Sequence, residues 1–563
     1  MQADPDAAER LDPADVVIVG LGAAGGIIAA RLAAAGLRVV GLEAGPTLTH
    51  RDFGFDELAD DFRNRLGAGK INAEVPTWRA RPGDEATTSR AGRTVSLMVN
   101  GVGGGTIHYA GQHLRLAPWH FRVRSASLER YGAGALPDDS TATDWPFTYD
   151  ELEPYYDAVE HELGVSGRGG VNPFEGPRSR DYPLAPLRRT GWTELVAEAS
   201  RRRDLHPFAG AAAILSEPFR GQPGCTYCGF CNFNGCHADA KASTFLNVIP
   251  QAQATGHLTV VPDARVVSLP VDAEGLASGA VYLADGRAYL QSARAVVLTA
   301  HTYENTRLLL LSRSDAFPDG LANNAGQVGR NAMSHVFIGM DGVFPGRKLN
   351  RFGGTWPQCT SIDDFNADNF DHTGLGFVGG GIVNAVPEAK PIGTALSTPP
   401  SVPRWGSAWK AWLAANGNSV GRLVATVESL PYEDSFLDLD PDVVDRIGMP
   451  VIRQTYRLHE QEDRRYDHVA TAMRELLLEA GAAETWPARP KLPAAPFQSV
   501  FGATRMGIDP DASVVDPFCA AHEVPNLVVV GASSFPTSGG YPPTATIQAL
   551  AWRAADRLVE SLR

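Results

Sequence analysis

The segment that most constrains the fold is residues 15–43, with the sequence DVVIVGLGAAGGIIAARLAAAGLRVVGLE. An apolar run of strand length, Val16 to Val19, leads into glycines spaced G-x-G-x-x-G. A helix of small residues then leads to a second apolar strand. This order predicts a strand–turn–helix–strand unit that binds the pyrophosphate of a dinucleotide. A glycine-rich turn in an ordinary α/β unit is the alternative, because a bare glycine triplet is weak evidence.

Each glycine of this unit, and the acid that ends it, has a physical reason to be there. Gly20 permits the tight turn, Gly22 lets the pyrophosphate approach the backbone, and Gly25 lets helix and strand pack closely. The start of the helix offers free N–H groups and a partial positive charge to the phosphates. Glu43 ends the second strand, where an acid accepts hydrogen bonds from a ribose hydroxyl.

Length and charge exclude several classes of protein. The chain has 563 residues and a formal net charge of −14, so we expect two or more domains and no binding to nucleic acid or an anionic membrane. No apolar run is long enough to span a membrane. The N-terminus, MQADPDAAERLDPAD, has no signal peptide and no twin arginine, which predicts a cytoplasmic location. A periplasmic or membrane-associated location would require export with a partner subunit.

Local signals predict the other elements. Thr148 and Glu151 form a capping box for a helix through Glu162, which Gly164 ends. Residues 165–224 are rich in Gly, Pro and Arg and are expected to be irregular. Further strands are expected at 257–267, 295–299 and 526–530, and helices at 304–311, 460–480 and 544–562.

The nucleotide-binding domain is predicted to be discontinuous, because strand and helix patterns of its kind return at the end of the chain. We expect it to comprise residues 12–130, 215–340 and 505–563, and to include a cysteine-rich loop. Residues 131–214 and 341–504, with long loops and short strands, are expected to form a substrate or cap domain.

Five motifs in order point to a family. They are GLGAAGG with LEAG, NGVGGGTIHYAGQ, AHTYENTRLLLLS, GQVGRNAMSH and NLVVVGASSFPTSGGYPPTATIQALAWRAADRL. Over essentially the whole chain, this set resembles the glucose–methanol–choline (GMC) oxidoreductases. The resemblance implies FAD, an α/β Rossmann-like FAD-binding domain, and an α+β substrate domain built on an antiparallel sheet. Members of the family mostly oxidise alcohols and sugars by passing hydride to flavin N5.

The resemblance also implies cofactor contacts. The segment from Asn100 to His108, including Gly104, would lie against the flavin ring, and the backbone near Val266 would hold the adenine. From the C-terminal part, the expected flavin contacts are Gly531, Ala532, Ser533 and Thr544. His108 resembles a histidine that bonds covalently to the flavin in some relatives. A noncovalent histidine near the ring, or a packed one, is the alternative.

Four of the six cysteines crowd into CTYCGFCNFNGC, at Cys225, Cys228, Cys231 and Cys236. Thiolates at this spacing suit an iron–sulfur cluster or zinc, and plain thiols or disulfides are the remaining alternatives. The segment resembles the flavoprotein subunits of bacterial gluconate, fructose and related sugar dehydrogenases. That resemblance implies a 3Fe-4S cluster on three of the four cysteines, a possible small subunit and a cytochrome electron acceptor.

The catalytic end departs from the family pattern. Ser499 stands where the family has a histidine that takes the alcohol proton, and Pro542 replaces a second His or Asn. A general base contributes typically ~10²–10⁴ in rate, so its loss matters. One explanation is that another residue supplies the base, and the four nearby candidates are Tyr541, Gln498, His301 and His335. Otherwise the substrate needs no strong base, or the site is not oxidative.

The sequence therefore predicts an FAD-dependent dehydrogenase that oxidises a sugar, glycoside or other alcohol and passes electrons through the cysteine segment to a protein acceptor. An oxygen-using oxidase of the pyranose-oxidase type and a non-redox, lyase-like flavoprotein are the alternatives.

Overall fold

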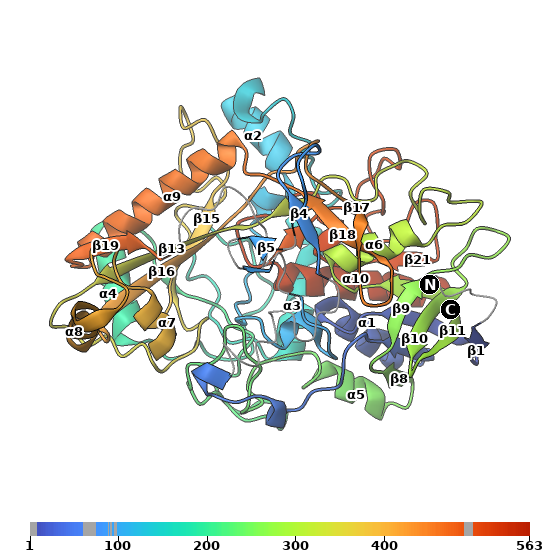
Figure 1. The fold of residues 1–563 in the computed structure, drawn as a ribbon, viewed down its shortest axis with the longest axis horizontal. Coiled ribbons are helices and arrows are strands. Elements are labelled where there is room, and N and C mark those ends of the chain that lie inside the picture. Colours follow the sequence, from blue (N-terminus) through green and yellow to red (C-terminus); the bar gives the residue numbers. More distant parts are fainter. Residues whose placement is uncertain (1–7, 60–74, 88, 91–92, 95–97, 489–498) are drawn as a thin grey trace.

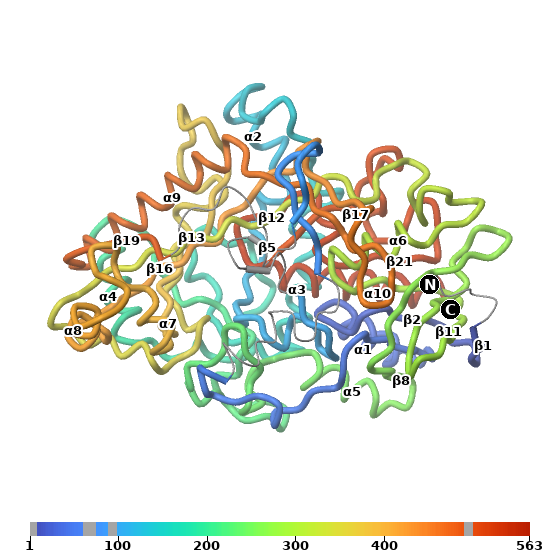
Figure 2. The backbone as a smooth tube through the Cα atoms, viewed as in Figure 1, coloured from blue at the N-terminus to red at the C-terminus, as the bar shows by residue number. Residues whose placement is uncertain are grey.

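The structure is a computed structural model that describes residues 8–59, 75–87, 89–90, 93–94, 98–488 and 499–563. Figure 1 shows two regions side by side: a sheet with helices α1 and α10 on the right, and a second sheet covered by α9 and α4 on the left. The chain begins and ends in the right-hand region. Figure 2 shows the N-terminal and C-terminal segments, blue and red, running close together there.

The first sheet explains why its domain is discontinuous. Its strands run in the order β8-β3-β2-β11-β10-β9, and β1 and β21 also pair with β11. The pairs β8/β3, β3/β2, β2/β11 and β11/β21 are parallel, as in a dinucleotide-binding fold. The strands are β1 (Glu9–Arg10), β2 (Ala14–Val19), β3 (Val39–Leu42), β8 (Leu258–Val261), β9 (Arg265–Ser268), β10 (Gly279–Ala284), β11 (Arg287–Leu298) and β21 (Leu527–Val529).

Helices cover this sheet and bury its apolar strands. Helix α1 packs on both α10 and α5, and α10 packs on α3. The largest core cluster combines β2 residues such as Val17 and Ile18 with α10 residues such as Ala549 and Leu550, all fully or almost fully buried. The helices are α1 (Ala23–Ala34), α3 (Tyr149–Leu163), α5 (Val248–Ala254), α6 (Thr302–Leu311) and α10 (Thr544–Leu562).

The second sheet is antiparallel, in the order β19-β13-β16-β15-β14-β7. Its apolar face packs under α9 and α4, where Leu423, Ala425 and Val383 join Met473 and Trp192 in one core. The bounds are β7 (Phe208–Ala209), β13 (Val336–Val343), β14 (Thr360–Ile362), β15 (Gly381–Ala385), β16 (Val420–Val427), β19 (Glu484–Pro487), α4 (Gly191–Arg202) and α9 (Glu460–Glu479).

Smaller elements join the two regions. Strands β17, β18 and β4 form one sheet, and the pairs β12/β20 and β5/β6 form two more. The bounds are β4 (Thr77–Arg79), β5 (Ser89–Arg90), β6 (Arg93–Thr94), β12 (Met333–Ser334), β17 (Phe436–Val444), β18 (Pro450–Thr455), β20 (Val500–Phe501), α2 (Val123–Tyr131), α7 (Pro391–Leu396) and α8 (Gly406–Asn416).

The predicted helix after Thr148 is confirmed at both ends. The Thr148 N–H donates to the Glu151 carboxylate at 2.8 Å, and Gly164 ends α3 in the left-handed conformation, with φ 73°. Two expectations are wrong. The region 165–224 contains the regular helix α4, and the single strand expected at 257–267 is two strands separated at Asp263, where φ is +53°. In addition, β13, β16 and β17 have 8, 8 and 9 residues, so the second region is not limited to short strands.

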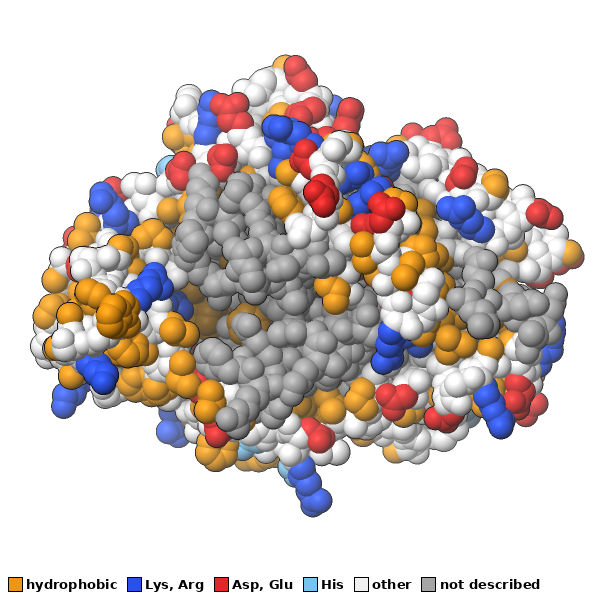
Figure 3. All heavy atoms as spheres, in the orientation of Figure 1, with side chains coloured by type: hydrophobic (Ala, Val, Ile, Leu, Met, Phe, Trp, Pro, Cys, Tyr) orange, Lys and Arg blue, Asp and Glu red, His pale blue; other side chains and the backbone are white. Residues whose placement is uncertain are grey.

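On the face shown in Figure 3, Lys and Arg side chains are interspersed with Asp and Glu. In the part of the chain that the structure describes, no helix has the length and apolar character needed to cross a membrane.

Candidate active site

One cavity of about 420 Å³ lies between the two main sheets. Its lining begins at the glycine turn after β2, at Gly20 and Gly22, and reaches the second sheet at Asn384 of β15 and Val424 of β16. The cavity therefore joins a dinucleotide-binding turn to a wall supplied by the other domain.

The backbone at the glycine turn packs so closely that there is no room for a Cβ atom. Gly20 has φ +90°, and a Cβ there would lie 2.7 Å from the Cα of Ala300. A Cβ on Gly104 would lie 2.8 Å from the Cα of Gly22, so the two glycine segments pack directly against each other at the cavity wall. The first residue of α1 follows Gly22, and no side chain caps this helix start. Its N–H groups are available to an anionic ligand, as expected for a pyrophosphate.

Glu43 is held at the end of β3 by three backbone donors. Its carboxylate accepts hydrogen bonds from the N–H groups of Leu21 at 3.0 Å, Gly45 at 3.1 Å and Gly101 at 3.0 Å. Burial raises the pKa of Glu43 to about 7, against the lowering effect of these hydrogen bonds. The side chain ties the first βα turn to the Asn100 segment, and it lines the cavity.

His108 lies in the cavity wall with one ring nitrogen lacking a partner. It is buried, and its Nδ1 atom has no hydrogen bond among the described residues. Burial, with smaller effects from Lys241 and His301, lowers the pKa of His108 to about 3, so the ring is neutral at physiological pH. Because Nδ1 has less than 1 Å² of accessible surface, a ligand in the cavity would meet this ring at another atom, where a neutral imidazole can act as a nucleophile or a hydrogen-bond acceptor.

The other predicted cofactor contacts divide into two groups. The structure places Asn100, Val266, Gly531, Ala532 and Thr544 in the cavity lining. Gly25 and Ser533 are not in that lining. A Cβ on Gly25 would lie 2.0 Å from the Gly20 carbonyl oxygen, which is the close packing expected of the third glycine. The Ser533 hydroxyl accepts a hydrogen bond from Asn305 Nδ2 at 3.0 Å, behind the wall.

Of the four candidate bases, His301 lines the cavity, as does Ser499, the residue that stands in place of the family histidine. His301 Nδ1 accepts a hydrogen bond from the Tyr303 N–H at 3.2 Å, so in the neutral ring the proton lies on Nε2. Burial lowers the pKa of His301 to about 4. This histidine can therefore donate a hydrogen bond through Nε2 but is poorly placed to accept a proton. Gln498 lies outside the described residues.

His335 and Tyr541 are not among the residues that line the cavity. His335 Nε2 lies 2.9 Å from the Gly539 carbonyl oxygen, to which it donates. The Tyr541 hydroxyl donates to the buried carboxylate of Asp363, and burial raises the pKa of Tyr541 well above its usual value. Direct proton transfer to either side chain therefore finds no support in their positions.

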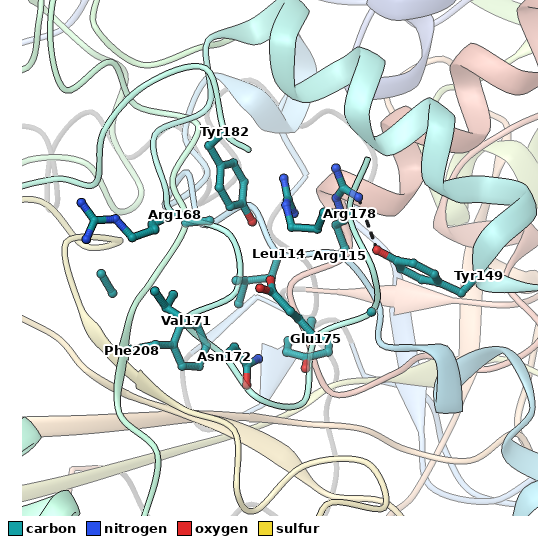
Figure 4. A pocket seen from close by; sticks show the side chains of 14 residues that line it. Leu114, Arg115, Tyr149, Arg168, Val171, Asn172, Glu175, Arg178, Tyr182 and Phe208 are labelled. Carbon is teal, nitrogen blue, oxygen red and sulfur yellow. Dashed lines mark hydrogen bonds between the residues drawn. The ribbon is translucent and has the colours of Figure 1, made fainter. Parts of the chain in front are cut away.

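Tyr541 instead borders a second, much smaller pocket of about 20 Å³, shown in Figure 4. Its charged lining residues are Arg115, Arg168, Arg178 and Glu175, and Arg115 donates to the Tyr149 hydroxyl at 3.3 Å. Arg115 also pairs with Glu153 at 2.8 Å and Glu160 at 2.7 Å, which are not part of the lining. The volume corresponds to about one water molecule, so this pocket has no room for a substrate.

The wall opposite the nucleotide turn contains polar residues that the sequence did not single out. They are Gln112, Asn232, Asn384, Arg422 and Thr426. Arg422 is held by Asp341 through two 2.7 Å hydrogen bonds, and the two residues face each other across β16 and β13. An asparagine in the middle of the apolar strand GIVNA was the available signal for Asn384.

The four clustered cysteines form no disulfide. The thiols lie near enough to affect each other electrostatically: burial raises the pKa of Cys225 to about 12, and Cys236 and Cys228 add to the rise. However, no group of three or more His, Cys, Asp or Glu side chains in the described chain is placed to bind a metal. The four-cysteine metal site therefore stays a prediction.

The cysteine loop is held instead by two buried charged residues. Lys241 Nζ donates to the carbonyl oxygens of Tyr109 and Cys231, both at 3.0 Å, and of Asn234 at 2.6 Å. Glu388 accepts from the N–H of Cys231 at 3.1 Å and from nearby backbone. Lys241 thus connects the loop directly to the segment that follows His108.

Comparison with known proteins agrees with this geometry. The sequence profile of the GMC oxidoreductase family matches residues 431–551. The gluconate 2-dehydrogenase flavoprotein of Pantoea cypripedii is 32% identical over 98% of this chain and 94% of its own length. The fructose dehydrogenase large subunit of Gluconobacter japonicus is 28% identical over 98% of each chain. Pyridoxine 4-oxidase from Mesorbium loti has a similar fold, with a TM-score of 0.63 at 19% identity over 97% of this chain and 99% of its own.

The fold and the cavity define the class as a two-domain, dinucleotide-binding oxidoreductase. The chain belongs to the GMC oxidoreductase family, and this membership implies FAD. The predicted family and the predicted combination of an α/β FAD-binding domain with an antiparallel substrate sheet are confirmed.

Proposed function

We propose that this protein is an FAD-dependent dehydrogenase that oxidises a hydroxyl group of a sugar, glycoside or other alcohol, with the flavin accepting the hydride. The observation that carries the proposal is the cavity of about 420 Å³ that connects the glycine turn to the polar wall of the second sheet. The relatives named for gluconate and fructose support a polyhydroxylated substrate.

The described residues fit FAD at several points. The start of α1 after Gly22 would hold the pyrophosphate, Glu43 the ribose, and the backbone near Val266 the adenine. Gly104 and Thr544 would lie beside the flavin, with Asn100 at the same wall. His108 presents a neutral ring in the cavity lining, which suits a covalent bond to the cofactor.

Few of the described side chains that line the cavity could remove a proton from the substrate. Pro542 has no side-chain acceptor, and His301 offers an N–H rather than a lone pair. Ser499 is a weak base, and its hydroxyl has no hydrogen-bond partner among the described residues. We propose that water in the cavity takes the hydroxyl proton as the hydride leaves the carbon for the flavin, and that His301 donates a hydrogen bond to the substrate oxygen through Nε2. The same loss of both usual polar groups is the observation that favours the rival, a non-redox flavoprotein.

We further propose that electrons leave through an iron–sulfur cluster, of the 3Fe-4S type, on three of the four clustered cysteines, to a cytochrome, with a possible small subunit. Free thiols within twelve residues are suitable soft ligands. The buried ammonium of Lys241 beside them favours an anionic group. Cluster binding would require the thiols to turn toward one another.

The proposal is tested by comparing the wild type with the double variant Cys228→Ser/Cys231→Ser. We expect the wild type to contain iron and, with a substrate sugar, to reduce a cytochrome faster than it forms peroxide. The double variant should lose the iron and the cytochrome reduction but keep anaerobic flavin reduction. Cys519→Ser is the matched control, because Cys519 is buried away from the loop.

Iron-free wild-type protein that forms peroxide rapidly would support the oxidase alternative and contradict the electron route. Equal loss of flavin reduction in the double variant would show that the loop shapes the active site and is not a relay.

A further inference from the structure

Two amide side chains, Gln112 and Asn384, meet in the cavity from different parts of the fold. Asn384 lies on β15, opposite Ser361 of β14 and Val424 of β16. Gln112 comes from the glycine segment that contains His108. The distance from Gln112 Nε2 to Asn384 Oδ1 is 2.9 Å, and both residues line the cavity.

The orientation of the Asn384 amide is set by three donors on one oxygen. Its Oδ1 accepts from Gln112 Nε2, from the Ser361 hydroxyl at 2.7 Å and from the Cys359 thiol at 3.4 Å. Because these donors hold Oδ1, the Nδ2 group of Asn384 points away from them. No described residue accepts a hydrogen bond from Asn384 Nδ2.

Gln112 presents the complementary group. Its Nε2 is engaged by Asn384 and lies 3.9 Å from the Cys359 sulfur, whereas its Oε1 receives no hydrogen bond from any described residue. Gln112 is only 5% exposed and Asn384 only 3%, but neither Gln112 Oε1 nor Asn384 Nδ2 is among the polar atoms closed off from solvent, so both unpaired groups face the cavity. A free acceptor and a free donor side by side on a cavity wall are available to a bound ligand.

We propose that Gln112 and Asn384 form the pair that binds the hydroxyl groups of the substrate, and that the pair selects polyhydroxylated molecules over simple alkanols. This inference rests on the proposed function. Gln112 Oε1 accepts from one hydroxyl, while Asn384 Nδ2 donates to the same hydroxyl or to the adjacent one. Because a hydroxyl is both donor and acceptor, a neighbouring acceptor and donor match a sugar or polyol. The wall beside Asn384 is apolar at Val424 and Ile338.

The test uses Asn384→Asp, which replaces the free donor with an acceptor of the same size, and Gln112→Met, which removes the free acceptor. The probes are D-gluconate, D-glucose and D-sorbitol, with 1-butanol as the simple alkanol. Binding is measured by calorimetry on dithionite-reduced holoenzyme, which cannot oxidise the probe, and turnover by anaerobic flavin reduction. Gln253→Glu, an exposed change on α5, is the control.

For the polyhydroxylated probe that the wild type binds best, we expect each variant to weaken binding by about 100-fold, since a site built to pair hydroxyls discriminates strongly. The loss should appear mainly in KM, with flavin content unchanged and 1-butanol affected less than about threefold. Wild-type affinity in both variants would overturn the inference, as would a wild type that binds none of the polyols. A wild type that binds polyols through this pair without oxidising them would contradict only the proposed function.

Discussion

His108 is the residue whose chemistry most directly decides how the cofactor is held. Its ring is buried, neutral and unpartnered at Nδ1, in the wall that the glycine segment forms. If the ring is bonded to the flavin, acid-denatured wild-type protein will keep its yellow colour in the precipitate. The variant His108→Ala will release all flavin to the supernatant, and His257→Ala, at an exposed position, will behave like the wild type. Complete release from the wild type would exclude the covalent bond.

For single residues, the sequence predicts those whose role depends on their neighbours along the chain. It misses those whose role depends on which strands lie next to each other in the sheet. Glu43 follows from its place at the end of a strand after the glycine turn. Gln112 and Asn384 could not be paired in this way, because they meet only when β15 is placed between β14 and β16. His301 and Tyr541 were chosen for their chemistry, but the Tyr303 N–H and Asp363 already engage the groups that would act.

At the scale of elements, a buried carboxylic acid lies between β16 and α9. Glu428 follows β16 and is 1% exposed. Its Oε1 accepts from the Gly380 N–H at 2.8 Å, while its Oε2 has no partner among the described residues. Burial raises the pKa of Glu428 to about 7, against the lowering effect of Arg465. The folded state therefore prefers the protonated acid.

Because the folded pKa lies above the usual value of 4.5, the contribution of Glu428 to stability falls as the pH rises from about 4.5 to about 7 and is constant above that. The variant Glu428→Gln, which resembles the protonated acid, is expected to be more stable than the wild type by about 3 kcal/mol at pH 8. At pH 5 the difference should be below about 1 kcal/mol. Urea unfolding at the two pH values measures both, and a pH-independent difference would contradict the assignment.

The elements that the sequence predicted correctly are those with strong local signals, such as the capped helix α3 and the amphipathic helix α10. Helix α4 was missed because its apolar residues, including Trp192 and Val196, lie in a region whose overall Gly, Pro and Arg content favours loops. The break between β8 and β9 depends on one left-handed residue, Asp263, which composition does not reveal.

At the scale of the whole molecule, the two sheets supply opposite walls of the cavity. The parallel sheet positions the glycine turn and Glu43, and the antiparallel sheet turns an apolar face to α9 and a partly polar face to the cavity. Lys241 attaches the cysteine loop to the segment that follows His108, and we propose that this segment faces the flavin and that electrons leave through the loop. Such an arrangement was predictable from the order of motifs, whereas the position of the loop's thiols was not.

The most direct test of the central claim is anaerobic mixing of the purified holoenzyme with a panel of sugars, glycosides, polyols and simple alcohols, while the visible flavin spectrum is recorded. The account predicts that at least one polyhydroxylated compound bleaches the flavin stoichiometrically and is itself recovered as the two-electron oxidised product. A flavin that stays oxidised with every compound, in protein that is folded and fully loaded with FAD, would contradict it.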